Sequence, residues 1–493
     1  MKKSVLFFFI FFSIVSCSDS EDSASASEPV LEETLAASPD TFYFEAAGGT
    51  DTFRISSNAI WNIDFTSDSW VYPSIQTAQG DARVILTAAV NSSGKERDTT
   101  LTVATSAVAT VLLKIQQDGN LVLPDSIAPD ASGMRDLTAL DFSRLMGAGW
   151  NLGNSLEAIS VNNGIYSGNE TSWGNPVVTK ELIDSVKAAG FTTVRIPVSW
   201  SNHMDATDDY KIDDSWKERV ARVVQYVLDD DMYAIINIHW DGGWMNHPDD
   251  DHQDSINGKL KAMWKQIAVY FRNDGDHLLF AGTNEVHVEN NYDAPTAENA
   301  AVQNSLNQTF VNAVRSTGGK NIYRQLIIQS YNTNAQYAVS DLVMPKDPTD
   351  NRLMVEIHFY DPYDFALQED DGYKTQWGKP FTGGDVSSWG QEDWVDEMFG
   401  HLKTTFVDKG IPVIMGEFGA LLRTGLGDRE ANHIKARNYY LNDVAKTAVA
   451  DGIVPVYWDN GVTGNNGFGL FDRSDGRVIH QDAVAAIISA LKK

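Results

Sequence analysis

The stretch LLFAGTNEVH, residues 278–287, sets an apolar run directly against an amide and a carboxylate, Asn284 and Glu285. An apolar run of this length is typical of a buried β-strand, and the interior of such a strand does not hold an unpaired charge. The polar residues at its end therefore indicate a strand that delivers side chains to the edge of a sheet. We expect Glu285 to lie where the strand leaves the core.

The same pattern recurs from about residue 136 onward, where short apolar strands end in polar residues. Amphipathic helical patterns such as residues 180–190 and 216–228 separate them. The expected strands are 146–152, 192–198, 233–239, 278–285, 325–330, 353–360, 412–418 and 453–458. Eight strand–helix units within residues 136–493 predict an α/β fold, a (β/α)8 TIM barrel.

In this fold the loops at the carboxyl ends of the strands carry the chemistry. Each residue found there has a plain structural explanation when taken alone, so the prediction of a site rests on the set. Two carboxylates, on the fourth and seventh strands, are expected to face each other across the barrel mouth, as retaining glycosidases require of a pair roughly 5 Å apart. The strand ends supply Arg195, His239, Asn284, Glu285, His358, Tyr360, Glu417 and Trp458.

These motifs resemble glycoside hydrolase family 5, within the clan of retaining (β/α)8 glycosidases. The family carries Asn-Glu after strand four and a Glu at strand seven, here in TNE, residues 283–285, and MGEFG, residues 415–419. Val286 and Trp240 depart from the residues that are common in the family. The resemblance extends over the barrel through GWNLGN (149–154), VRIPVSW (194–200), INIHWDGGW (236–244), EIHFYDP (356–362) and VYWDN (456–460).

The resemblance implies roles for the central residues. Glu285 resembles the acid/base, whose proton is held near the working pH, and Glu417 resembles the nucleophile, which must stay ionised. Different environments are expected to split the pKa values of the two carboxyl groups. Arg195 resembles the cation that keeps Glu417 charged, and Tyr360 resembles a hydroxyl donor to the same carboxylate. Asn284 resembles the donor to the sugar 2-hydroxyl.

The remaining candidates surround this centre. His239 and His358 are expected to orient the reacting groups and the sugar ring. Trp458 resembles the floor under the sugar being cleaved, because an indole face matches the C–H face of a β-glucosyl unit. Three loop residues either line flanking subsites or pack beneath neighbouring loops: Asn154, Trp173 and Trp244.

The resemblance implies a retaining endo-β-1,4-glucanase of the cellulase type that hydrolyses plant polysaccharide without a cofactor. A xyloglucan-specific endoglucanase, a mixed-linkage glucanase and a β-mannanase are alternatives within the family. A metal hydrolase is another alternative, with His239, Asp241 and His358 as ligands, but no tight spacing such as His-x-His supports it. A non-catalytic surface glycan-binding protein is the last alternative, and binding alone does not need both Glu285 and Glu417.

Composition is consistent with a neutral polymer as the partner. The chain has 493 residues with 43% hydrophobic content, enough for one large and one smaller domain. Its formal net charge of -29 argues against nucleic acid and anionic membrane surfaces as ligands. The oligomeric state stays open.

Residues 39–119 contain short β-branched and aromatic runs between Gly, Asn and Asp turns, which predict a small β-sandwich. WNIDFTSDSW (61–70) and KIQQDG (114–119) resemble the BACON module, an immunoglobulin-like domain. Trp61 and Trp70 either form a sugar platform or serve core packing in a module that acts as a spacer, and we favour core packing or a spacer role. Residues 120–135, with two prolines, are expected to form a semi-rigid linker before the barrel.

The first residues predict export. Residues 1–17 combine two lysines with a short apolar run that is too short to span a membrane. Cys17, the only cysteine, resembles the lipidation site of a bacterial lipoprotein, and the acidic run SDSED (18–22) resembles a surface-export tag. Residues 18–38 are expected to form a flexible tether. These features predict a surface-exposed lipoprotein of the outer membrane, with plain secretion as the alternative.

Overall fold

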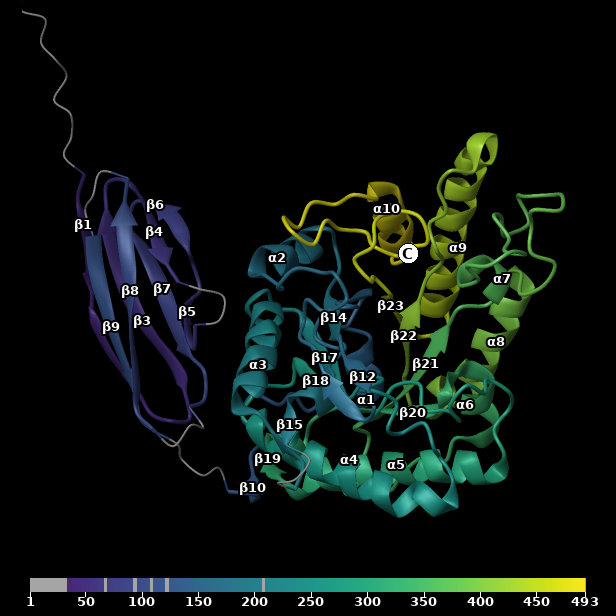
Figure 1. Cartoon of the computed structure of the whole chain (residues 1–493), viewed down its shortest axis with the longest axis horizontal. Coiled ribbons are helices and arrows are strands. Elements are labelled where there is room, and N and C mark those ends of the chain that lie inside the picture. Colours follow the sequence, from purple (N-terminus) through teal and green to yellow (C-terminus); the bar gives the residue numbers. More distant parts are fainter. Residues whose placement is uncertain are drawn as a thin grey trace, which may run out of the picture.

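The structure is a computed structural model that describes residues 33–65, 69–91, 95–106, 110–119, 124–205 and 209–492. The expected signal peptide, Cys17 and residues 18–32 of the expected tether lie outside the described residues. Among the helices of the described ranges, none is long and apolar enough to cross a membrane. Figure 1 shows two bodies, a pair of sheets and a barrel wrapped by helices.

The N-terminal body consists of a four-stranded and a five-stranded sheet that share one hydrophobic core. The first has the order β1 (Leu35–Ser38), β3 (Gly49–Ser57), β7 (Ala82–Ala88), β5 (Val71–Pro73). The second has the order β2 (Thr41–Phe44), β9 (Thr110–Gln117), β8 (Arg97–Thr105), β4 (Ile60–Asp64), β6 (Thr77–Gln79). Burial alternates along the strands, as in β4 and β9, because successive side chains point to opposite faces. The predicted sandwich of strands is therefore present.

The two tryptophans of this body differ in their surroundings. Trp61 is fully buried in the shared core and donates its indole N–H to the carbonyl oxygen of Gly80 at 2.8 Å. Trp70 is half-buried, and the guanidinium of Arg97 lies 4.5 Å from the centre of its ring. The favoured prediction of core packing is confirmed for Trp61.

Two segments outside the predicted strands are also paired. Leu35–Ser38, at the end of the expected tether, form β1 and pair with β3, because Leu35 and Ala37 turn their side chains onto the sandwich core. Within the expected linker, β10 (Ile127–Pro129) pairs with β19 (Gly318–Gly319). The approach is close: a Cβ on Gly318 would lie 2.9 Å from the carbonyl carbon of Ile127, so only glycine fits there.

The eight predicted strands close into a parallel barrel. In order they are β11 (Gly149–Asn151), β14 (Thr193–Ile196), β17 (Tyr233–Asn237), β18 (Leu278–Ala281), β20 (Leu326–Asn334), β21 (Leu353–Phe359), β22 (Val413–Phe418) and β23 (Ile453–Tyr457). Register shifts in the β20–β21, β21–β22 and β22–β23 pairs all fall near the carboxyl ends of the strands. Such irregularities re-aim side chains, and here they lie at the end where the candidate site residues gather.

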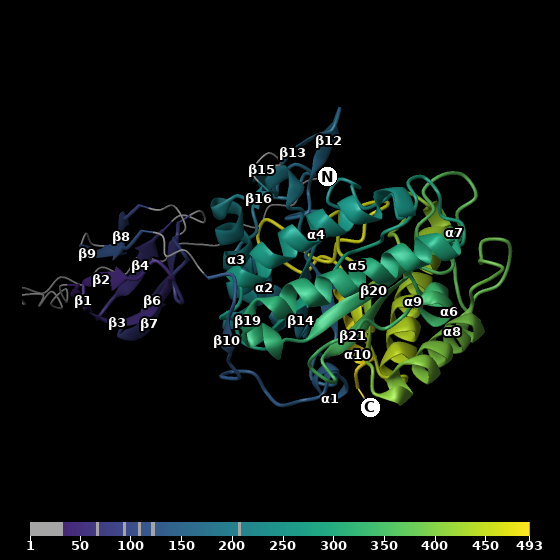
Figure 2. The ribbon, with the colours of Figure 1, turned by 90° about the horizontal axis from the view of Figure 1, so that it is seen from below.

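Helices cover the outside of the barrel, and α4 and α5 run side by side along it (Figure 2). The helices are α1 (Ala139–Ser143), α2 (Lys180–Ala188), α3 (Asp214–Asp229), α4 (Asp250–Tyr270), α5 (Ala297–Ser316), α6 (Ala335–Asp341), α7 (Tyr363–Ala366), α8 (Glu392–Thr405), α9 (Glu430–Ala450) and α10 (Gln481–Ser489). Short 3₁₀ turns span Ser201–His203, Lys320–Ile322, Val407–Lys409 and Gly427–Arg429. Two small hairpins pair β12 (Ser160–Asn162) with β13 (Ile165–Ser167) and β15 (Met204–Asp205) with β16 (Lys211–Ile212).

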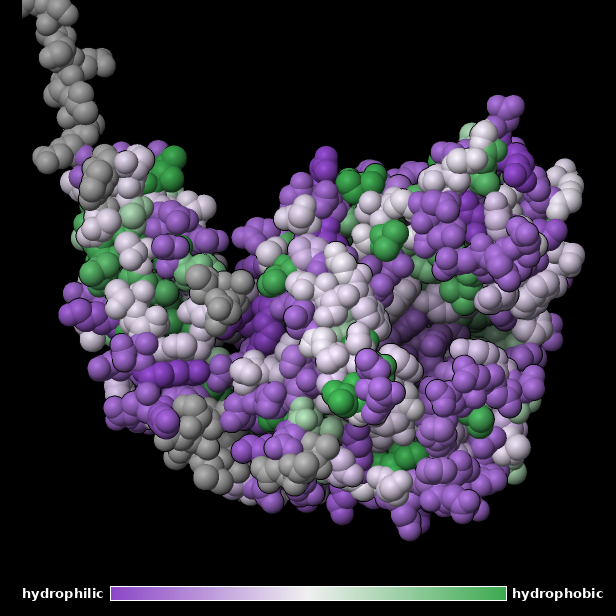
Figure 3. All heavy atoms as spheres, in the orientation of Figure 1, coloured by the Kyte–Doolittle hydropathy of each residue, from purple (hydrophilic) through white to green (hydrophobic). Residues whose placement is uncertain are grey.

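The amino end of the barrel is closed by apolar packing. Ala139 and Phe142 of α1 join a buried cluster with residues inside the barrel, including Leu279 and Ile414. Phe142 meets Tyr233, the first residue of β17, edge to face at 5.1 Å between ring centres. Because this apolar cluster fills the amino end, the polar side chains gather at the carboxyl end of the barrel. On the face drawn in Figure 3, hydrophilic residues predominate and hydrophobic residues are scattered among them.

Candidate active site

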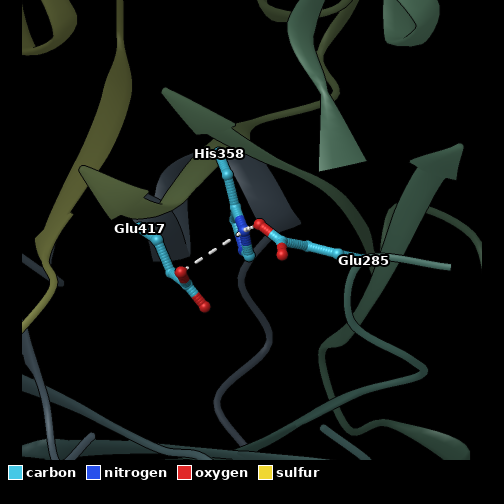
Figure 4. A group of neighbouring side chains, drawn as sticks. All are labelled: Glu285, His358 and Glu417. Carbon is cyan, nitrogen blue, oxygen red and sulfur yellow. Dashed lines mark hydrogen bonds and ion pairs between the residues drawn. The ribbon is translucent and has the colours of Figure 1, made fainter. Parts of the chain in front are cut away.

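The two carboxylates predicted from the sequence meet at the carboxyl end of the barrel. Glu285 follows β18 and Glu417 lies on β22, and His358 of β21 stands between them (Figure 4). A carboxylate oxygen of each Glu and a ring nitrogen of His358 all lie within 4.8 Å of one another. This spacing matches the separation of roughly 5 Å found in retaining glycosidases and is too short for the water that an inverting pair accommodates.

The backbone after β18 is held so that Glu285 leaves the barrel wall. The side-chain oxygen of Gln329 on β20 accepts hydrogen bonds from the Thr283 backbone N–H at 2.9 Å and from the Thr283 hydroxyl at 3.1 Å. The side chain of Glu285 is 39% exposed, whereas that of Glu417 is 7% exposed. The charge at the end of this apolar stretch therefore lies in a cleft and not in the core.

Arg195 forms ion pairs with two carboxylates of the site, those of Glu356 and Glu417. Its guanidinium is fully buried, with Nε 2.8 Å from Glu356 and Nη1 3.0 Å from Glu417. It also donates to the side-chain oxygens of Asn151 at 2.9 Å and of Asn284 at 2.7 Å. The predicted contact of Arg195 with Glu417 is present, and both terminal nitrogens of the guanidinium donate to side-chain oxygens.

His358 links three carboxylates. Its Nδ1 lies 2.6 Å from Glu285 and 3.6 Å from Glu417, and its Nε2 lies 3.5 Å from Glu356. Burial by itself lowers the pKa of His358, but Glu417 and Glu285 outweigh it and raise the pKa to about 9. The ring is therefore suited to donate to the carboxylates around it.

The surroundings shift the pKa values of the two carboxyl groups in opposite directions. Burial raises the pKa of Glu417 above its usual value despite the opposing charges of His358 and Arg195. For Glu285, burial also raises the pKa, but His358 outweighs it and the result lies below the usual value. The physical reason is distance, because His358 Nδ1 is 1 Å closer to Glu285 (2.6 Å) than to Glu417 (3.6 Å).

Tyr360 donates its hydroxyl to Glu417 Oε2 at 3.0 Å, as predicted. Burial, followed by the charge of Glu417, raises the pKa of Tyr360 well above its usual value, so the phenol keeps its proton. With Arg195 on the other oxygen, each oxygen of Glu417 has a donor. This carboxylate is held in one orientation.

His239 and Trp458 stack on each other at the carboxyl end of the barrel. Their rings are parallel to within 2°, with 5.9 Å between the ring centres. Asn237 donates its amide N–H to His239 Nδ1 at 3.2 Å, which leaves the ring proton on Nε2. Burial lowers the pKa of His239 well below its usual value, so the ring is neutral. Gly153 packs against the Trp458 indole, whose atoms would lie 2.9 Å from a Cβ at that position.

The three weaker candidates are not among the described residues that line the two clefts beside Glu285. Trp244 is half-buried, donates its indole N–H to Asp241 at 2.7 Å and packs under the ammonium of Lys259 at 4.2 Å. Trp173 is 39% exposed and donates to the Ile159 carbonyl. Asn154 is in the left-handed region, φ 57°. Their role in substrate binding stays a prediction.

The metal set considered from the sequence is not brought together. Asp241 is buried and accepts hydrogen bonds from the backbone N–H groups of Trp200 and Ser201, from the Ser201 hydroxyl and from Trp244. Its oxygens are therefore already used to hold the loop after β17. Across the described part of the chain, the group of His, Asp and Glu ligand atoms close enough for one ion is Glu285, His358 and Glu417, which leaves out His239 and Asp241.

Two further residues of the site were missed by the sequence reasoning. Glu356 pairs with Arg195 and His358. Burial raises the pKa of Glu356, but the charge of Arg195 outweighs burial and lowers that pKa to about 2. Gly416 makes room for it, because a Cβ there would lie 2.7 Å from the Glu356 carboxyl carbon. Asn151 bridges Arg195 to the backbone of Gly416. The spacing of Glu356 and His358 on one strand, two residues apart, was the available signal, because it places both on one face.

Comparison with known proteins agrees with this geometry. The sequence profile of the cellulase family, glycosyl hydrolase family 5, matches residues 159–464. The xyloglucan-specific endo-β-1,4-glucanase of Bacteroides ovatus is 44% identical over 500 residues, covering 99% of this chain and 97% of that protein. Endoglucanase A of Paenibacillus barcinonensis is 40% identical over 384 residues, 74% of this chain and 94% of that protein.

Solved structures give the same result. The Bacteroides ovatus family 5 xyloglucanase in complex with an XXXG heptasaccharide superimposes with a TM-score of 0.72, at 44% identity over 94% of this chain and 100% of that chain. A family 5 xyloglucanase of Paenibacillus pabuli superimposes with a TM-score of 0.67, at 40% identity over 71% of this chain and 100% of that chain. With the fold, the paired carboxylates and these similarities together, the chain belongs to glycoside hydrolase family 5.

Proposed function

We propose that this protein is a retaining endo-β-1,4-glucanase that hydrolyses internal bonds of a plant β-glucan, with xyloglucan as its preferred polymer. The observation that carries the mechanism is the distance within 4.8 Å between the oxygens of Glu285 and Glu417. The preference for xyloglucan is supported by the relatives from Bacteroides ovatus and Paenibacillus pabuli, which are named for that substrate.

In the first step Glu417 attacks the anomeric carbon and Glu285 gives a proton to the glycosidic oxygen as the bond to it breaks. A glycosyl ester on Glu417 and a shortened chain result. Glu417 is suited to attack because Arg195 and Tyr360 hold both of its oxygens. Glu285 is suited to exchange protons because it is the more exposed carboxylate. Substrate that covers Glu285 removes its remaining water, which raises its pKa toward that of an acid.

In the second step Glu285 takes a proton from water, and the resulting nucleophile attacks the anomeric carbon and releases Glu417. Asn284, held by Arg195, is placed to donate to the sugar 2-hydroxyl, whose interactions strengthen as positive charge develops on the ring. His358 and His239 orient the carboxylates and the ring. Trp458 is the floor beneath the sugar, with its indole plane parallel to His239.

The proposed substrate is tested with the purified protein on four polymers: xyloglucan, mixed-linkage β-glucan, soluble cellulose derivative and β-mannan. We expect the highest kcat/KM on xyloglucan, weaker activity on the two linear glucans and none on mannan, measured as reducing ends released. A fall in viscosity ahead of the release of reducing ends is expected for internal cleavage. Higher kcat/KM on mannan than on any glucan would contradict the proposal.

We propose that residues 39–119 are a BACON-type, immunoglobulin-like spacer, followed by a linker at 120–135 and the catalytic domain at 136–493. The two-sheet body and the buried Trp61 support a packed module over an exposed sugar platform. We further propose that Cys17 carries a lipid and that the protein is displayed on the outer membrane, on the strength of the N-terminal residues.

The anchor is tested by changing Cys17→Ser. Because one acyl chain gives only marginal membrane binding, anchoring depends on all the chains at this residue. We expect the wild-type protein to take up a fatty-acid probe, to fractionate with the outer membrane and to be released from intact cells by protease. Cys17→Ser is expected to lose the label and the membrane fraction but to keep its specific activity. Unlabelled wild-type protein in the culture medium would instead indicate plain secretion.

A further inference from the structure

Two clefts open beside Glu285, on either side of the segment that follows β18. The smaller, of about 390 Å³, is lined by residues after β17 and β18, among them Asn246 and Glu289. The larger, of about 610 Å³, is lined by the carboxyl ends of β20 and β21 and by residues of α6, α7 and α8. Among the described residues that line them, Glu285 and Tyr292 are shared by both. The clefts therefore meet at the candidate acid/base.

Tyr292 stands at this junction with its ring open to solvent. It is 73% exposed, and its ring stacks on that of His287 with 4.9 Å between centres and 28° between planes. His287 Nδ1 in turn lies 2.6 Å from the backbone oxygen of Glu285. The exposed ring is thus tied to the main chain of the residue that faces the glycosidic oxygen. An aromatic face held in this way is suited to stacking against a sugar ring.

The two clefts differ in character. The smaller has mainly polar side chains, including Asn246, Asn284 and Glu289, which suit the hydroxyl groups of a single sugar. The larger adds an exposed aromatic ring, Tyr363, which is 56% exposed, together with Leu367. A polar pocket and a larger cleft with exposed aromatic rings, which meet at Glu285, fit a chain that branches at that point.

We infer that Tyr292 is a specificity-determining residue that divides a branched glucan on the leaving-group side of the cleaved bond. The glucosyl unit on the leaving-group side of the cleaved bond stacks on Tyr292. This unit carries the glycosidic oxygen, which must lie within reach of Glu285. The main chain continues in the larger cleft, and a sugar attached at O6 of that unit enters the smaller one. A linear glucan leaves the smaller cleft empty, so the branch supplies remote binding energy that a linear chain lacks. This inference rests on the proposed β-glucanase function.

The test fills each cleft separately. Glu289 borders the smaller cleft and Gln336 the larger, and both are exposed, so Glu289→Trp and Gln336→Trp form a matched pair that leaves the core untouched. We expect Glu289→Trp to lower kcat/KM on xyloglucan roughly tenfold, which is the range for one group that does not fit its pocket. On linear mixed-linkage glucan we expect kcat/KM to change less than about twofold. Gln336→Trp is expected to lower activity on both polymers.

Tyr292→Ala and Tyr292→Phe give a second measurement. Loss of the ring is expected to raise KM on both polymers, with the larger increase on xyloglucan, and Tyr292→Phe is expected to behave as wild type because stacking needs the ring and not the hydroxyl. Equal effects of Glu289→Trp on the branched and linear polymers would overturn the inference. So would wild-type enzyme that cleaves the linear polymer but not xyloglucan. Wild-type enzyme that is inactive on both would instead overturn the proposed function.

Discussion

Glu417→Gln is expected to lower kcat/KM on β-glucan by on the order of 10⁶-fold, the scale of losing the nucleophile in a covalent hydrolase. An amide of the same shape keeps the neighbours Arg195 and Tyr360 within reach but forms no glycosyl ester. The measurement is kcat/KM on xyloglucan and on an aryl β-cellotrioside, with circular dichroism to verify the fold. The loss is expected in kcat more than in KM, because substrate still binds to the same walls.

Glu417→Ala with sodium azide tests the role itself. Removal of the side chain opens the face of the sugar that Glu417 attacked, and azide is expected to attack there and release the α-glycosyl azide. Glu356→Gln is the control, because Glu356 is also buried and also contacts Arg195 but forms no bond to the sugar in the proposed mechanism. It is expected to lose activity that azide does not restore. β-Glucanase activity retained by Glu417→Ala without azide would remove the residue from this role.

Much of the fold was predictable because it repeats. Each barrel strand is a short apolar run between helical patterns, and all eight appear in the closed sheet. The boundaries were less predictable. β20 continues to Asn334, beyond the expected end at residue 330, through Asn332 and Thr333 in the left-handed region. That extension is polar and pairs with His358 only after a register shift, which no apolar pattern indicates.

The site was predictable in its members but not in its electrostatics. Strand ends identify Arg195, Glu285 and Glu417, because a barrel brings the ends of distant strands together. The direction in which each carboxyl pKa shifts depends on burial and on His358, whose position between the two side chains is not encoded in spacing along the chain. Asp241 illustrates the same limit, because its hydrogen bonds come from a different strand loop, at Trp200 and Ser201.

Glu285→Ala is expected to lower kcat on polysaccharide by roughly 10²- to 10⁴-fold, the usual contribution of a general acid. The loss is expected to depend on the leaving group, because a sugar alkoxide needs the proton and a dinitrophenolate does not. On a dinitrophenyl β-cellotrioside the first step therefore proceeds, and a burst of dinitrophenol equal to the enzyme concentration should precede slow turnover. Mass spectrometry at that stage is expected to find the glycosyl group attached to Glu417.

Azide then separates the two carboxylates by the anomer that each variant produces. In Glu285→Ala, Glu417 still forms the glycosyl ester on one face of the sugar, so azide must attack from the face where water normally enters and release the β-glycosyl azide. Glu417→Ala releases the α-anomer, because azide takes the place of the missing nucleophile. Opposite anomers from two residues whose oxygens lie within 4.8 Å follow only if each acts on its own face of the ring. The same anomer from both variants, or equal losses of Glu285→Ala on good and poor leaving groups, would contradict this division of roles.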